Sequence, residues 1–141
     1  VHGLPRQESL ARVEELARTL GLEPVLARRA GQLSGGWQRR LSIAMALVAR
    51  PEILFLDEPT LGLDVLARRE LWQVIQDLKG RVTTILTTHY LEEAESLADR
   101  VGIMAHGRLR AVGTAAELKA LAGTADFEDA FVTLAGERRD A

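Results

Sequence analysis

Two adjacent carboxylates, Asp57 and Glu58, directly follow the apolar run Ile53–Leu56. Such a run predicts a strand buried on both faces of a parallel sheet. A carboxylate at the end of this strand can hold Mg²⁺, usually through water, beside phosphate oxygens, and its neighbour can orient and deprotonate an attacking water. A bare Asp-Glu-Pro is more often a plain turn. The strand before it and the sequence TLGLD after it favour phosphate chemistry.

A glycine turn, Ser34-Gly35-Gly36, precedes this strand by one expected helix. Ser34 is a good N-cap, and two glycines let a phosphate approach the exposed N–H groups at a helix start, where the helix dipole favours anions. Alone, such a turn is more often a cap or a flexible connection, but the helix and the Asp-Glu strand that follow favour anion binding. Arg39 and Arg40 are expected on the solvated face of this helix.

His89 follows a second β-branched strand, at residues 83–88. Because the carboxyl ends of parallel strands meet at one edge of a sheet, His89 is expected on the same rim as Asp57 and Glu58. Its ring N–H could donate to a terminal phosphate oxygen in the transition state. A lone histidine is usually structural, and no ligand spacing around this one indicates a metal site.

The sequence lacks the phosphate-binding loop that would complete such a site. None of the 141 residues forms a G-x-x-x-x-G-K-[ST] phosphate loop, and the only lysines, Lys79 and Lys119, follow no glycine loop. The chain also begins without Met, so we expect it to be the C-terminal part of something longer. A net charge of −2 gives no bulk attraction to nucleic acid or anionic lipid, and the absence of cysteine excludes disulfides and thiolate metal sites.

The hydrophobic pattern predicts alternating helices and strands, which implies parallel α/β layering with a hairpin added at the edge of the sheet. Helices are expected at residues 9–20, 35–49, 65–78, 91–98, from 115 onward and at 126–134, and strands at 53–56, 83–88, 101–104 and 109–112. Asp64 and Thr114 are expected to cap helices, Thr114 with Glu117 in a capping box.

With these residues in hand, the chain resembles an ABC transporter ATP-binding subunit. LSGGWQRRLSIAMAL resembles the signature motif and its helix, ILFLDE resembles Walker B with the catalytic glutamate, TLGLD resembles the D-loop, and TTH resembles the switch-histidine loop. The resemblance implies a partial P-loop NTPase (RecA-like) core with a mostly parallel sheet, plus the helical subdomain that carries the signature motif. Its parts would be residues 1–50 (helical subdomain), 51–113 (core) and 114–141 (C-terminal helical extension).

The resemblance also implies a mechanism with ATP and Mg²⁺, in which two cassettes sandwich two nucleotides head to tail. Ser34, Gly35 and Gly36 would contact the γ-phosphate bound on the partner cassette. Asp57 would serve Mg²⁺, Glu58 would act as general base, His89 would hold the γ-phosphate, and Asp64 would bridge the dimer interface. The partners implied are a second copy of the cassette and a membrane permease, at the cytoplasmic face of the plasma membrane.

Further segments, such as RRELWQVIQDLKG and TTHYLEEAESLADRVGIM, are similar to bacterial exporters of the drug, antibiotic or ABC-2 type. The sequence departs from the family at Trp37, where Gln is commonest, and the family's Walker A loop, adenine-stacking aromatic and Q-loop would precede Val1. The fragment alone is therefore predicted to be inactive. Two alternatives stay open: a nucleic-acid-associated ABC ATPase, although no nucleic acid is expected at this charge, and a module that binds a permease or partner without catalysis.

Overall fold

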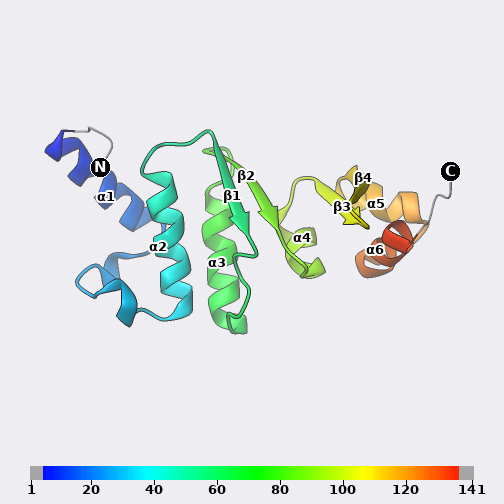
Figure 1. Ribbon diagram of the computed structural model, residues 1–141, viewed down its shortest axis with the longest axis horizontal. Coiled ribbons are helices and arrows are strands. Elements are labelled where there is room, and N and C mark those ends of the chain that lie inside the picture. Colours follow the sequence, from blue (N-terminus) through cyan, green and yellow to red (C-terminus); the bar gives the residue numbers. More distant parts are fainter. Residues whose placement is uncertain (1–4, 137–141) are drawn as a thin grey trace. The chain divides into compact units, whose positions relative to one another are not determined.

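The computed structural model describes residues 5–136, and the chain forms two compact units that divide after Thr87. Each unit combines helices with a two-stranded sheet (Figure 1). The division falls inside the expected core at 51–113, and the three-part scheme drawn from the sequence remains a prediction.

The first unit builds a helical part that leads into a parallel strand pair. Its elements are α1 (Arg6–Thr19), the 3-10 helices η1 (Glu23–Val25) and η2 (Ala30–Gln32), α2 (Gly35–Leu47), β1 (Ile53–Asp57), α3 (Val65–Asp77) and β2 (Thr83–Thr87). Contacts join α1 to α2 and α2 to α3, and Figure 1 shows α2 and α3 side by side. The core of this part is apolar, and its buried residues include Leu16, Leu20, Ile43, Leu47, Leu71 and Ile75.

The helix boundaries follow local sequence signals. Helix α1 begins directly after Pro5, three residues earlier than predicted, because Pro5 is the N-cap residue and its carbonyl accepts the first helical hydrogen bond, from the Ser9 N–H at 3.0 Å. Helix α2 begins after Ser34, as predicted, and ends at Leu47, four residues before Pro51.

Arg12 joins the first two helices. One guanidinium nitrogen of Arg12 donates to the carbonyl of Leu47 at the end of α2, over 2.6 Å, and the other donates to Glu15 over 2.8 Å. The hydrogen bond from Arg12, together with its positive charge, lowers the pKa of Glu15. A cation at the carbonyl end of α2 also complements the dipole of that helix.

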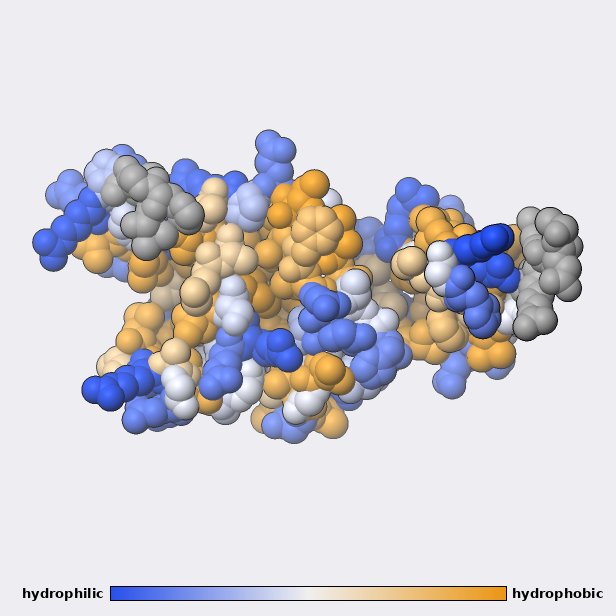
Figure 2. Space-filling view, viewed as in Figure 1, coloured by the Kyte–Doolittle hydropathy of each residue, from blue (hydrophilic) through white to orange (hydrophobic). Residues whose placement is uncertain are grey.

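Strands β1 and β2 are parallel, and their register aligns Asp57 with Thr87 at the carboxyl end. Helix α3 is the crossover between them, as expected for a parallel pair. The expectation that β1 is buried on both faces is wrong. Leu54 and Leu56 are buried, but Ile53 and Phe55 on the opposite face are 50% and 71% exposed. The described residues of this unit pack against only one face of the sheet, and the apolar area over β1 and β2 is visible in Figure 2.

The second unit is a hairpin packed against short helices. It contains α4 (Leu91–Leu97), β3 (Val101–Ala105), β4 (Arg108–Gly113), α5 (Ala115–Ala122) and α6 (Phe127–Gly136). Its core joins Ile103 of β3 to Leu118, Phe127 and Leu134 of the last two helices. The predicted capping box is confirmed: Thr114 Oγ1 accepts from the Glu117 N–H at 3.2 Å, and Glu117 Oε2 accepts from the Thr114 N–H at 2.8 Å.

The predicted hairpin is present in the second unit, where β3 pairs antiparallel with β4, and its expected place at the edge of the parallel sheet remains a prediction. His106 and Gly107 have φ of 52° and 72°, the backbone of a tight two-residue turn, and Ala105 pairs with Arg108 across it. Within residues 5–136, β3 hydrogen-bonds only with β4, so these strands make a sheet of their own. The physical reason is local: the turn supplies β3 with an antiparallel partner, and α6 packs against the same strand.

Candidate functional site

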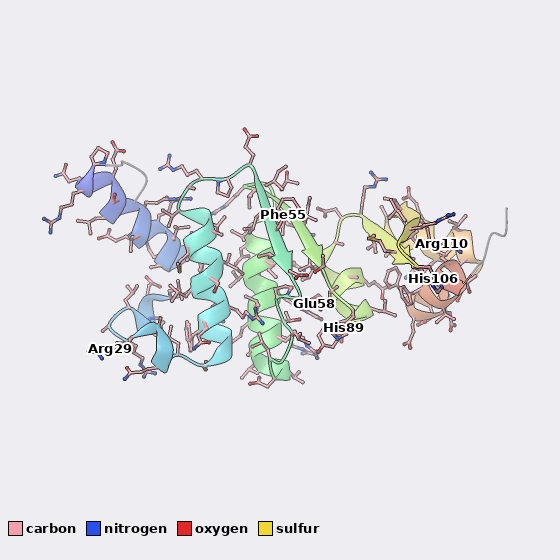
Figure 3. All side chains as sticks on the ribbon, viewed as in Figure 1. Arg29, Phe55, Glu58, His89, His106 and Arg110 are labelled. Carbon is pink, nitrogen blue, oxygen red and sulfur yellow. The ribbon has the colours of Figure 1, made fainter. Side chains whose placement is uncertain are left out.

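The carboxyl end of β1 carries the predicted acidic pair. Asp57 is the last residue of the strand and is exposed, and Glu58 follows it half-buried. Figure 3 labels Glu58 directly beyond the end of β1, with Phe55 on the strand before it. Both carboxylates therefore stand at the sheet edge where ligands of parallel α/β folds gather.

Thr87 links these two residues and was not among the sequence candidates. Its hydroxyl donates to Asp57 Oδ1 and accepts from the Glu58 N–H at 3.2 Å, while the Thr87 carbonyl accepts from the same N–H at 3.0 Å. Its place opposite Asp57 could not be predicted from the sequence, because the two strands were predicted to end at residues 56 and 88. The hydrogen bonds themselves needed the register of the strands.

Glu58 has an unusual backbone. Its φ is +46°, in the left-handed region that residues other than glycine adopt uncommonly. The conformation is held by hydrogen bonds on both sides: its N–H donates to Thr87, and its carbonyl accepts from the Leu61 N–H at 3.1 Å. Strained backbone of this kind concentrates at functional sites, where surrounding contacts hold it in place.

The glycine turn forms the start of α2, as predicted. Ser34 is the N-cap residue, with an extended backbone and no capping hydrogen bond from its side chain. Ser34 and Gly35 are exposed, and the first N–H groups of a helix have no partner within it. These groups provide the chemistry needed to bind an anionic phosphate oxygen.

Gly36 lies tightly against the start of α3. A Cβ at Gly36 would stand 3.3 Å from the Cβ of Ala67, and one at Gly35 would stand 3.3 Å from a methyl group of Leu63. The glycine turn is therefore packed against the segment that connects the acidic pair to α3. Bulk added to the turn would displace one of these two parts.

Asp64 caps α3, as predicted. Its carboxylate accepts from the Ala67 N–H at 2.9 Å. This contact is structural and independent of the expected role of Asp64 at a dimer interface, which remains a prediction.

We expect Asp64→Ala to lower the free energy of unfolding by about 1 kcal/mol, because an orphan N–H loses its acceptor at the start of α3. Asp64→Asn should retain nearly all of the stability, since Asn caps as well as Asp does. Urea unfolding of the three proteins followed by circular dichroism measures this. Equal destabilisation by Ala and Asn would show that the charge, rather than the cap, stabilises α3.

Trp37 and Arg40 form a contact on α2 that the sequence did not reveal. The Arg40 guanidinium lies 4.7 Å from the centre of a Trp37 ring and pairs with Glu70 of α3 at 2.7 Å. The expectation that Arg40 lies on a solvated helix face is wrong, because its side chain is only 12% exposed. Glu70 lies thirty positions away in the sequence, so local periodicity could not show the pair.

His89 stands between β2 and α4, at the beginning of the second unit. Figure 3 labels it there, and its ring lies 4.3 Å from that of Tyr90, centre to centre. Asp57 and Glu58 belong to the first unit. The expected placement of His89 on the same rim remains a prediction.

The acidic pair suits a metal held mainly by a nucleotide. Among residues 5–136, no group of three or more His, Cys, Asp or Glu side chains could hold a metal ion by itself. Asp57 offers one carboxylate at an open sheet edge, which fits Mg²⁺ bound through water and phosphate oxygens.

Within residues 5–136, no helix is long and apolar enough to cross a membrane.

A parallel strand pair with carboxylates at its end, preceded by a glycine turn at a helix start, is consistent with a partial P-loop NTPase fold. The family described as "ABC transporter" matches residues 4–61. A solved structure described as "Structure of ATP binding subunit of ABC transporter" superimposes with a TM-score of 0.74 at 30% identity, covering 94% of this chain and 57% of that one.

The chain is also similar in sequence to ABC transporters and to an ATP-binding protein of drug resistance. The chain is 48% identical over 124 residues to "ABC transporter A family member 11" of Arabidopsis thaliana, covering 88% of this chain and 13% of the relative. It is 47% identical over 124 residues to "Daunorubicin resistance ATP-binding protein DrrA3" of Streptomyces coeruleorubidus, covering 87% of this chain and 39% of that protein. It is 44% identical over 117 residues to "Phospholipid-transporting ATPase ABCA3" of Homo sapiens, covering 83% of this chain and 7% of that protein.

Over most of its length the chain is therefore similar to part of an ABC transporter ATP-binding domain. It spans well under two thirds of the length of each of these proteins. The expected fold class is thereby confirmed, and the similarities agree with the interpretation of the chain as part of an ABC cassette, while the bacterial drug-exporter subfamily remains a prediction.

Proposed function

We propose that this chain supplies the signature turn and the catalytic carboxylates of an ATP-hydrolysing cassette that works as a pair. The observation that carries the proposal is the acidic pair at the carboxyl end of β1, in the same unit as an exposed glycine turn at the start of α2. Each cassette would present its turn to the nucleotide of the other, so that Ser34, Gly35 and Gly36 bind the γ-phosphate across the interface.

The proposed chemistry is an in-line attack of water on the γ-phosphorus. Glu58 accepts a proton from the water as its oxygen bonds to phosphorus, and the bond from phosphorus to the β–γ bridging oxygen breaks. Asp57 would hold the Mg²⁺ that accompanies ATP. His89 donates a hydrogen bond to the γ-phosphate, and Asp64 bridges the two cassettes.

The proposed setting is a membrane exporter. Two cassettes at the cytoplasmic face of the plasma membrane would couple closure around ATP to movement of a permease. The similarity to a daunorubicin resistance protein and to a phospholipid-transporting ATPase supports export of an apolar or amphiphilic compound. Among such exporters, we propose that this chain belongs to the bacterial drug-exporter subfamily.

The 141 residues alone are not expected to hydrolyse ATP, because they contain no Gly-x-x-x-x-Gly-Lys loop. The lysine of such a loop supplies major contacts to the β- and γ-phosphates. Phosphate release should be measured for this chain alone and mixed with a segment that carries such a loop. Activity in the mixture alone supports the proposal. Activity of this chain by itself would contradict it, and so would inactivity of a mixture shown by gel filtration to have assembled.

A further inference from the structure

Thr87 lies beside both carboxylates of the proposed hydrolytic site. It is the last residue of β2 and aligns with Asp57, the last residue of β1. Aligned residues on neighbouring strands project from the same face of a sheet. The Thr87 side chain is therefore directed to the carboxylate of Asp57 by the register of the two strands.

Both hydrogen-bonding functions of the Thr87 hydroxyl are in use. A hydroxyl offers one donor and two acceptor sites. The Thr87 hydroxyl donates to Asp57 Oδ1 and accepts from the Glu58 N–H at 3.2 Å. Because a β-branched side chain has few rotamers available, these two bonds have a defined direction.

These bonds have different consequences for the two acidic residues. The bond to Asp57 holds one carboxylate oxygen and so fixes the direction in which the other oxygen points. The bond from the Glu58 N–H holds the backbone of a residue whose φ is +46°. The Thr87 carbonyl, 3.0 Å from the same N–H, reinforces that backbone conformation.

We propose that Thr87 is a positioning residue for hydrolysis of a Mg²⁺–nucleoside triphosphate. Its hydroxyl fixes the orientation of the Asp57 carboxylate and the backbone from which Glu58 reaches the attacking water. The inference rests on the proposed function and adds to it a residue that touches neither nucleotide nor water.

The test uses the complete ATP-binding cassette with Thr87→Val, which keeps the shape of the side chain and removes the hydroxyl. Groups that orient a metal-binding carboxylate typically change metal affinity or activity about 10- to 100-fold. We expect kcat for ATP to fall by about that factor with little change in KM. The Mg²⁺ concentration that half-saturates binding of a fluorescent, non-hydrolysable ATP analogue should rise by a similar factor.

Two further variants separate positioning from general damage. Thr87→Ser keeps the hydroxyl and should restore most of kcat and of the Mg²⁺ midpoint. Thr83→Val makes the same chemical change at the opposite end of β2, on the same exposed face, and should leave both readouts unchanged. Thr87→Ala replaces Thr87→Val if circular dichroism shows that the valine variant does not fold.

The inference is overturned if the Mg²⁺ midpoint of Thr87→Val equals that of wild type, if Thr83→Val is equally impaired, or if Thr87→Ser behaves like Thr87→Val. Failure of the wild-type cassette to bind or hydrolyse Mg²⁺–ATP would overturn the proposed function instead. The two failures are therefore distinguishable within one set of measurements.

Discussion

Glu58→Gln in the complete cassette should lower ATP turnover by about 100- to 10,000-fold, because a neutral amide cannot accept the proton of the attacking water. Binding of ATP should persist, since the amide has nearly the same shape and the glycine turn is untouched. The expected state is a cassette pair that holds unhydrolysed ATP. Phosphate release, together with the nucleotide recovered after gel filtration, measures both parts of this result.

The backbone of Glu58 makes the choice of control important. Its φ of +46° is held by hydrogen bonds through its own N–H and carbonyl, and neither involves the carboxylate. A change confined to the carboxylate therefore leaves those bonds available. Glu52→Gln, just before β1, removes a carboxylate remote from the strand end and should leave turnover unchanged. If Glu58→Gln hydrolysed ATP at the wild-type rate, Glu58 would not be the general base.

Local signals in the sequence predicted the elements that position the site. The apolar run before Asp57, the glycines after Ser34 and the acid at Asp64 each act through neighbouring backbone, so their effects can be read from the residues nearby. The strand, the helix start and the cap were all found where these signals placed them. The parallel pairing followed from the helix between the two strands.

Features that depend on residues distant in the sequence were missed. Apolar composition shows what β1 is able to bury, but not which of its faces neighbours cover, so the exposure of Phe55 could not be predicted. The pairing of Arg40 with Glu70 and the bonds from Thr87 to Asp57 depend on helix packing and strand register. The hairpin after α4 was correctly predicted, because its turn and both of its strands are adjacent in the sequence.

Gly36→Val should also produce a large loss of activity, through packing rather than chemistry. The first side-chain carbon would lie 3.3 Å from the Cβ of Ala67, and the two γ-methyl groups of valine need still more room. Because α3 is fixed at its start by the cap from Asp64, we expect the glycine turn to move instead. A shift of about 1 Å at a substrate-positioning group can cost about 100-fold in rate. Turnover by the complete cassette measures the loss, and unfolding experiments check that the protein remains folded.

The contact between Gly36 and Ala67 supplies its own control. Gly31→Val introduces the same side chain at a glycine where an added Cβ would meet none of the described residues within 4 Å, so its activity should stay near that of wild type. The smaller change Gly36→Ala should be impaired less than Gly36→Val, and Ala67→Gly should partly restore it by removing the opposing methyl group. Ala67→Gly costs about 1 kcal/mol in helix propensity, so the rescue is judged by activity per folded protein. If Ala67→Gly restores nothing, the tight contact between α2 and α3 does not set the position of the glycine turn.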